Sequence, residues 1–146
     1  MAACQLNALR TYDVPPRWLL DLAWEHGLRV LVGLPWEQHV AFLDERGRAA
    51  DIERRLRAGV RSVASHPALL CLAIGNEVPA PIARWLGPKR LERFLARLAR
   101  AARAEDPGAL ITYVNYPSTE YLRLPFLDLV AFNVYLEDRT RYEAYL

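Results

Sequence analysis

A glutamate and an asparagine stand side by side where an apolar run ends, and a carboxylate in such a place can transfer protons. The run at residues 69–75 reads LLCLAIG, and Asn76 and Glu77 follow it directly. A carboxyl group whose pKa is raised by burial or by a neighbouring charge can donate or accept a proton during bond cleavage. Glu77 would also suit a helix start, which Pro79 and Pro81 favour. An acid/base role and a structural role for Glu77 both stay open at this point.

Polar and aromatic residues follow the other apolar runs as well. In parallel α/β folds, the residues at the carboxyl ends of strands meet at one rim, where functional groups collect. Carboxylates, amides and arginine bind sugar hydroxyls, and aromatic rings stack on the apolar faces of sugars. We therefore interpret these residues as a candidate carbohydrate site, while Arg10 would also suit a structural pairing and Trp36 a lid over the core. The further candidates are Arg10, Trp36, Glu37, Asn115, Tyr116, Asn133 and Tyr135.

The elements that must position these residues are an alternation of short apolar runs and segments of helical period. We predict five strands, at residues 6–11, 28–34, 69–75, 110–115 and 127–133. Helices are predicted after Pro15 and Pro16, and at residues 49–65, 88–105 and 118–123. The nearly continuous apolar strands indicate a parallel sheet that is covered on both faces. An α/β fold with one domain over residues 1–146 follows, either an open doubly wound sheet or part of a barrel.

Two motifs in the right order resemble glycoside hydrolase family 2, a family of retaining β-glycosidases. The strand that ends in Gly75-Asn76-Glu77 resembles the fourth barrel strand of that family, and Asn7-Ala8-Leu9-Arg10 resembles the Asn-x-x-Arg motif of its second strand. The resemblance covers about residues 5–137. It implies a partial (β/α)₈ TIM barrel that contains barrel strands two to six. It also implies that Glu77 is the general acid/base, that Asn76 binds the sugar 2-hydroxyl and that Arg10 lies near the nucleophile.

The same resemblance implies that one of the two catalytic carboxyl groups, the nucleophile, is missing from this chain. Retaining hydrolysis needs two carboxyl groups about 5–5.5 Å apart, one as nucleophile and one as acid/base. In the family, the nucleophile follows strand seven, so the remainder of the barrel, strands one, seven and eight, is an expected partner. We expect the isolated chain to be inactive. The alternative is a non-catalytic sugar-binding or scaffolding barrel attached to another carbohydrate-active module, such as a glycosyltransferase.

Composition excludes other classes of partner. The 19 basic and 17 acidic residues give a net charge of +2, which gives no case for nucleic-acid binding. No apolar run approaches the length of a membrane helix, and no pair of histidines has the spacing of a zinc motif. We expect no cofactor and no metal. Cys4 and Cys71, without a signal-peptide pattern, predict a reducing, cytoplasmic location.

The first and last strands of a five-stranded piece would have exposed edges. Such edges predict association or poor solubility of the isolated chain.

Overall fold

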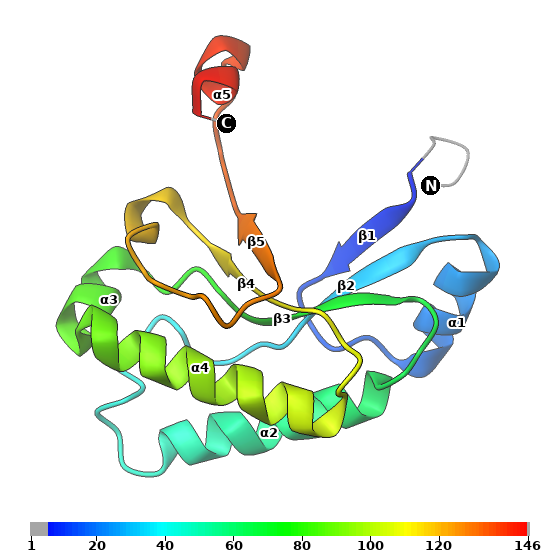
Figure 1. Ribbon diagram of the computed structural model, residues 1–146, viewed down its shortest axis with the longest axis horizontal. Coiled ribbons are helices and arrows are strands. Elements are labelled where there is room, and N and C mark those ends of the chain that lie inside the picture. The colour runs from blue at the N-terminus through cyan, green and yellow to red at the C-terminus, as the bar shows by residue number, and fades with distance from the viewer. Residues whose placement is uncertain (1–5, 146) are drawn as a thin grey trace.

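Five parallel strands form a curled sheet in the computed structural model, which describes residues 6–145. Cys4 lies outside the described residues. The strands pair in consecutive order, β1-β2-β3-β4-β5. Figure 1 shows the sheet curling, with β1 and β5 rising from its two sides. The strands are β1 (Ala8–Thr11), β2 (Arg29–Gly33), β3 (Leu69–Asn76), β4 (Ile111–Asn115) and β5 (Leu129–Phe132).

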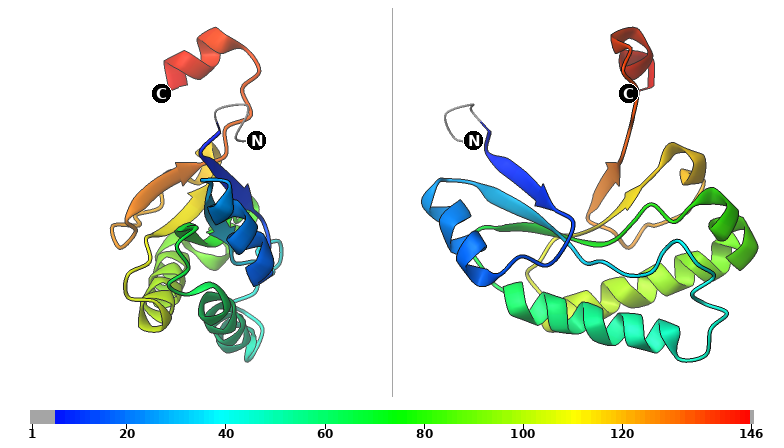
Figure 2. Two further views of the ribbon diagram at one scale, coloured as in Figure 1. Left: turned by 90° about the vertical axis from the view of Figure 1, so that its right-hand side faces the viewer. Right: turned by 180° about the vertical axis from the view of Figure 1, so that it is seen from behind.

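Two long helices cover the outer face of this sheet. In Figures 1 and 2, α2 and α4 lie side by side beneath the strands, while α1 lies beside β2. The prediction of helices in these places is confirmed, with α4 starting and ending as predicted. Apolar side chains at intervals of three and four residues explain both long helices, since this spacing lines one face. The helices are α1 (Arg17–Glu25), α2 (Arg48–Val63), α3 (Ala80–Leu86), α4 (Pro88–Glu105) and α5 (Arg139–Tyr145).

The two faces of the sheet differ in the size of their side chains. The outer face carries large residues such as Val32, Ile74 and Tyr113, which pack against α2 and α4 in the hydrophobic core. The inner face carries smaller side chains, including Cys71 and Thr112, both of which are fully buried. Burial also raises the pKa of the Cys71 thiol to about 11, so Cys71 serves as a small buried residue of the inner face.

The curl decides between the two architectures that the sequence left open. An open doubly wound sheet reverses its strand order part-way, whereas this sheet keeps one consecutive order throughout. Its two outermost strands approach each other at their carboxyl ends, because Arg10 on β1 donates a 2.9 Å hydrogen bond to Asn133, which follows β5. The chain is therefore a partial (β/α)₈ barrel, a curled half-barrel with helices between its strands.

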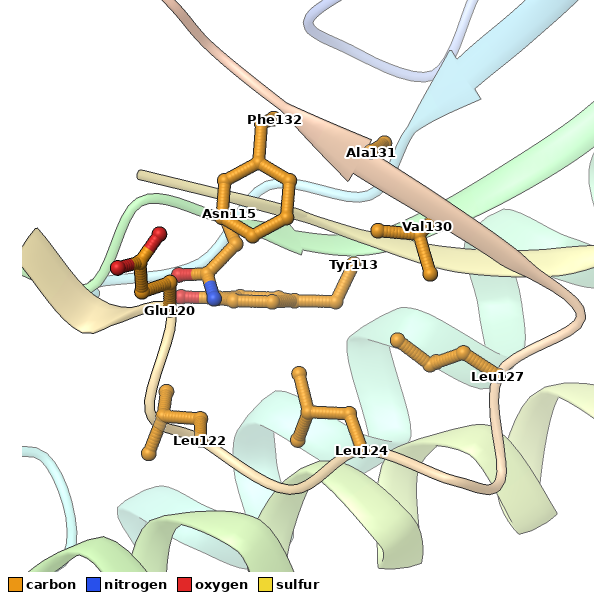
Figure 3. A pocket seen from close by; sticks show the side chains of 9 residues that line it. All are labelled: Tyr113, Asn115, Glu120, Leu122, Leu124, Leu127, Val130, Ala131 and Phe132. Carbon is orange, nitrogen blue, oxygen red and sulfur yellow. The ribbon is translucent and has the colours of Figure 1, made fainter. Parts of the chain in front are cut away.

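The predicted helix at residues 118–123 is wrong. Only a three-residue 3₁₀ turn, η2 (Pro117–Thr119), forms between β4 and β5. The buried amide of Asn115 explains the turn, because its oxygen accepts hydrogen bonds from the Thr119 hydroxyl and the Tyr116 N–H. Pro125 then blocks a longer helix. The connection instead leaves a largely apolar cavity of about 220 Å³ on the outer face, lined by residues that include Leu124 and Phe132 (Figure 3).

The last helix, α5, was not predicted. It stands away from the sheet in Figures 1 and 2, and none of its residues is buried. A helix without a buried stripe leaves no apolar period in the sequence, so pattern reading had no signal to find.

Gly33 at the end of β2 lies close against the backbone of residues 11 and 12, and its replacement gives a first prediction. A Cβ added at Gly33 would lie 2.6 Å from the carbonyl oxygen of Tyr12 and 2.7 Å from that of Thr11. Because neither backbone atom can move without shifting β1, we expect Gly33→Ala to lower the free energy of unfolding by about 2 kcal/mol. Urea denaturation measures the change. Gly108→Ala is the matched control, since its nearest neighbour is 3.8 Å away, and an equal loss in both variants would contradict the prediction.

Candidate functional site

Three polar side chains from three strands meet at the mouth of the half-barrel. Arg10 on β1 donates hydrogen bonds to Asn76 on β3 (2.6 Å) and to Asn133 after β5 (2.9 Å). The Asn133 amide in turn donates to the oxygen of Asn76 at 3.0 Å. Each contact spans more than 50 residues of sequence, so the curl of the sheet alone creates this cluster. Parallel strands place their carboxyl ends at one rim, and Arg10 meets the end of β3 there through Asn76.

Glu77 follows Asn76 in an unusual backbone conformation. Its φ is +38°, which residues other than glycine rarely adopt, and such strain is common at functional sites. The flanking hydrogen bonds hold it there. The Glu77 N–H donates to the carbonyl of Val114 at 2.9 Å, and the next N–H, that of Val78, donates to the Tyr113 hydroxyl at 2.8 Å. One carboxylate oxygen of Glu77, Oε1, is buried and has no hydrogen-bond partner among the described residues.

The Tyr113 hydroxyl therefore supports the backbone that carries Glu77, which gives a second prediction. Tyr113 is 1% exposed, and burial raises the pKa of its phenol, so the hydroxyl stays neutral and can accept from Val78. In Tyr113→Phe the buried Val78 N–H loses its partner, and we expect the free energy of unfolding to fall by about 1–2 kcal/mol. Chemical denaturation measures it. Tyr121→Phe, at a tyrosine that is 47% exposed, should change little, and a stable Tyr113→Phe would contradict the assignment.

Glu77 faces a cavity of about 410 Å³ with mainly apolar walls. Its walls come from the loops after β2, β3, β4 and β5, and Glu77 is the only carboxylate among those of its lining residues that the structure describes. The rings of Tyr116 and Tyr135 lie 6.1 Å apart at a tilt of 38°. The negative charge of Glu77 is the main cause that raises the pKa of Tyr135. The lining residues are His39, Glu77, Val78, Pro79, Ala80, Pro81, Tyr116, Ser118 and Tyr135.

A second cavity at the rim has Asn76 among its lining residues. Its volume is about 180 Å³, and Arg10, Asp13, Gln38 and Asn76 contribute polar side chains to it. The Arg10 guanidinium carbon stands 4.5 Å from the centre of the Tyr12 ring, a cation–π contact at the rim. Asn76 lines this second cavity and Glu77 lines the first, so the two consecutive residues belong to different cavities of the rim.

Three of the candidates lie elsewhere. The Trp36 indole is 6% exposed and donates to the carbonyl of Ile74 at 2.8 Å, so it is a core residue under the rim rather than a sugar platform. The Asn115 amide is buried and holds the η2 turn, where it has no free group for a hydroxyl. Glu37 pairs with Arg55 on α2 at 2.6 Å. Partial burial, the largest single effect, raises the pKa of Glu37. The Arg55 hydrogen bond, a backbone hydrogen bond and the charges of Arg55 and Arg48 together outweigh it, so the pKa of this carboxyl lies below its ordinary value.

The reason for these corrections is that a strand-end position gives the place of a side chain but not its direction. Tyr116, Asn133 and Tyr135 do line the mouth, together with Arg10, Asn76 and Glu77. Tyr12 directly follows β1, and its place at a strand end predicts the position at the rim that its contact with Arg10 shows. Tyr113 gave no such signal, because it stands within an apolar strand and contacts Val78 only after the sheet has curled.

No cluster of three or more histidine, cysteine, aspartate or glutamate side chains in residues 6–145 is arranged to hold a metal ion. Across the same part of the chain, no helix combines the length and apolarity that crossing a membrane requires.

The curled sheet and its consecutive strand order define the chain as a segment of the (β/α)₈ barrel class, and the solved structures that share this fold include β-glucuronidases. Beta-glucuronidase 2 of Bacteroides uniformis, bound covalently to cyclophellitol-6-carboxylate aziridine, matches with a TM-score of 0.78 at 22% identity, over 95% of this chain and 18% of that chain. The apo β-glucuronidase of Ruminococcus gnavus matches with a TM-score of 0.67 at 17% identity, over 88% of this chain and 23% of that chain.

These similarities establish the fold of this chain. The chain spans about a fifth of the length of the two enzymes. No family model matches it, and no curated protein does.

Proposed function

We propose that this chain supplies the acid/base half of a retaining β-glycosidase site of the glycoside hydrolase family 2 type. In this proposal Glu77 protonates the oxygen of the leaving group and later takes a proton from the attacking water. Asn76 and Asn133, held by Arg10, bind sugar hydroxyls on the polar side of the site. Tyr116 and Tyr135 form the aromatic side.

The single observation that carries the proposal is the position of the Glu77 carboxylate. Glu77 lines the aromatic cavity and directly follows Asn76 of the amide cluster, and one oxygen of its carboxylate is buried and unpartnered among the described residues. A buried polar atom without a partner is uncommon, and at a functional site a substrate can supply the missing hydrogen bond. A glycosidic oxygen is the group that a general acid in this position would contact.

A second carboxylate is the group that the proposed site still needs. Since Glu77 is the only carboxylate among the described residues that line its cavity, a nucleophile must come from outside that set. We propose that the remainder of the barrel, strands one, seven and eight of the family pattern, brings this second carboxylate to the site. The carbohydrate substrate would then lie in the closed barrel mouth.

A comparison of two proteins tests this function, and it gives a third prediction. The 146-residue chain alone should not hydrolyse aryl β-glycosides above the rate of buffer, because one carboxylate cannot complete retaining hydrolysis. The protein expressed with its native flanking sequence should hydrolyse them. Aryl β-glucuronides are the first substrates to test, since the fold neighbours are β-glucuronidases, and a panel of other aryl β-glycosides follows.

The outcomes separate the enzyme from the scaffold. Turnover by the isolated chain that Glu77→Gln abolishes would contradict the need for an external nucleophile. A flanked protein that binds glycosides but hydrolyses none of the panel would support a sugar-binding scaffold instead.

A further inference from the structure

We propose that the outer surface of helices α2 and α4 is a docking surface for an acidic segment of a partner protein. The two helices together contain eleven basic and four acidic residues, whereas the rest of the chain contains eight basic and thirteen acidic ones. Basic charge is therefore concentrated on this pair of helices, although the net charge of the whole chain is only +2. A surface with such an excess of one sign of charge attracts a partner surface of the opposite sign.

Four of these basic residues form a stripe along α4, called the basic stripe below. They stand at intervals of four, four and three residues, so that each lies about one turn from the next on one face of the helix. This face is opposite to the one that packs under the sheet, whose buried residues include Leu91, Leu95 and Leu98. All four side chains belong to exposed residues. The basic stripe consists of Lys89, Arg93, Arg97 and Arg100.

The acidic residues of α2 and α4 do not neutralise the basic stripe. Three of the four pair with two arginines each, and the fourth accepts a 2.8 Å hydrogen bond from the backbone N–H of Arg123. Arg97 alone in the stripe has an ion-pair partner in the part of the chain that the structure describes. The charges of Lys89, Arg93 and Arg100 are therefore available to a partner. The four acidic residues are Asp51, Glu53, Glu92 and Glu105.

Ion pairs between α2 and α4 fix the two helices relative to each other. Arg57 on α2 donates hydrogen bonds to Glu105 at 3.0 Å and to the carbonyl of Ala101 at 3.3 Å, both on α4. Arg97 on α4 pairs with Glu53 on α2. Because these contacts set the position of the basic stripe relative to α2 before a partner binds, less ordering is needed on binding.

A cavity of about 250 Å³ next to the stripe shows how this surface binds a carboxylate. Four arginines and one glutamate are among its lining residues, so an acidic side chain of a partner meets an excess of positive charge there. Glu53 accepts hydrogen bonds from both Nε (3.1 Å) and Nη2 (2.9 Å) of Arg57, a charge-assisted contact that a second carboxylate can repeat. The lining residues are Ala50, Glu53, Arg54, Arg57, Arg61 and Arg97.

The composition of the surface favours an acidic protein segment over a membrane or a nucleic acid. Helices that bind membrane surfaces insert apolar side chains between the lipids, and grooves for single-stranded nucleic acid carry aromatic rings on which bases stack. Neither a large apolar nor an aromatic side chain is among the described residues of the basic stripe and its cavity. Guanidinium groups that bind carboxylates are the main chemistry that this surface offers.

The surface lies apart from the proposed glycosidase site. In Figure 2, α2 and α4 lie beneath the sheet, while further barrel strands would pair with its edges at β1 and β5. A completed barrel would therefore leave the surface accessible. None of the stripe residues lines either cavity at the rim, so the docking surface and the proposed function can fail independently.

Fluorescence anisotropy of a labelled ten-residue polyglutamate peptide, titrated with the 146-residue chain, tests the surface. Arg93→Gln combined with Arg100→Gln should weaken binding about threefold to thirtyfold, the range expected for the loss of two exposed ion pairs. The matched control combines Arg17→Gln and Arg141→Gln, which remove the same charge from exposed residues of α1 and α5. At physiological salt distant charges are screened, so the control should change the affinity by less than about twofold.

Two further titrations identify other occupants, one with a ten-nucleotide polyuridylate and one with vesicles of equal parts phosphatidylcholine and phosphatidylserine. Peptide binding that the stripe variant weakens and the control variant retains supports the docking surface. Absence of peptide binding, or equal losses in the two variants, would overturn it. Tighter binding to the polyuridylate or to the vesicles than to the peptide would also overturn it, since the surface would then serve a nucleic acid or a membrane.

Discussion

Glu77→Gln, made in the protein with its native flanking sequence, is expected to lower kcat for glycosides with poor leaving groups by about 10²- to 10⁴-fold, the range of general acid–base catalysis. Glutamine keeps the size of the side chain but cannot donate an acidic proton to the departing oxygen. A dinitrophenyl leaving group departs without protonation, so its release in the first step should be nearly unchanged. This difference between substrates separates an acid/base role from a general loss of folding.

Azide supplies the second half of this test. It needs no general base, so it should attack the anomeric carbon of the glycosyl-enzyme, break the bond to the nucleophile and release a glycosyl azide. Added azide should therefore restore turnover of the dinitrophenyl glycoside by the variant. Glu120→Gln is the control, because Glu120 is exposed and lines the outer cavity. Equal losses for good and poor leaving groups, without rescue, would contradict the role of Glu77.

Arg10→Met is expected to have the largest effect on stability, a fall of about 3 kcal/mol in the free energy of unfolding. The guanidinium makes two hydrogen bonds that join β1 to the ends of β3 and β5, and a hydrogen bond to a charged group contributes about 1.5–3 kcal/mol. Methionine keeps the apolar stem of the side chain but makes neither bond. Urea denaturation of the isolated chain measures the change directly.

Two further variants show whether the two hydrogen bonds of the Arg10 guanidinium cause the fall in the free energy of unfolding. Arg10→Lys keeps the charge but lacks the planar group that reaches two amides at once, so it should recover only part of the loss. Arg17→Met removes an exposed arginine of α1 and should leave stability within about 0.5 kcal/mol of the unchanged protein. An Arg10→Met variant as stable as Arg17→Met would show that the cluster does not hold the mouth together.

The order of elements was predictable from the sequence because each strand and long helix has its own local pattern. Apolar runs such as residues 69–75 and the apolar face of α4 depend only on near neighbours. The curl of the sheet could not be predicted from these local patterns, because an open sheet and a barrel have the same ones. The barrel came from the resemblance carried by Asn76-Glu77 and Arg10, and the consecutive strand order confirms it.

The site was predictable in position but not in detail. Arg10, Asn76 and Asn133 share a rim because parallel strands end at one edge, but they come within hydrogen-bonding distance only because the sheet curls. Trp36 and Asn115 follow strands too, yet their side chains turn into the core and into the η2 turn. Those directions depend on packing between segments far apart in the chain, and a local pattern does not contain that information.

The separation of two carboxyl groups tests the central claim most directly. A crystal structure of the protein with its native flanking sequence should show the Glu77 carboxyl about 5–5.5 Å from a second carboxyl that approaches from the strand seven position, the spacing of retaining glycosidases. A closed barrel whose mouth holds no second acidic side chain within reach of Glu77 would contradict the account.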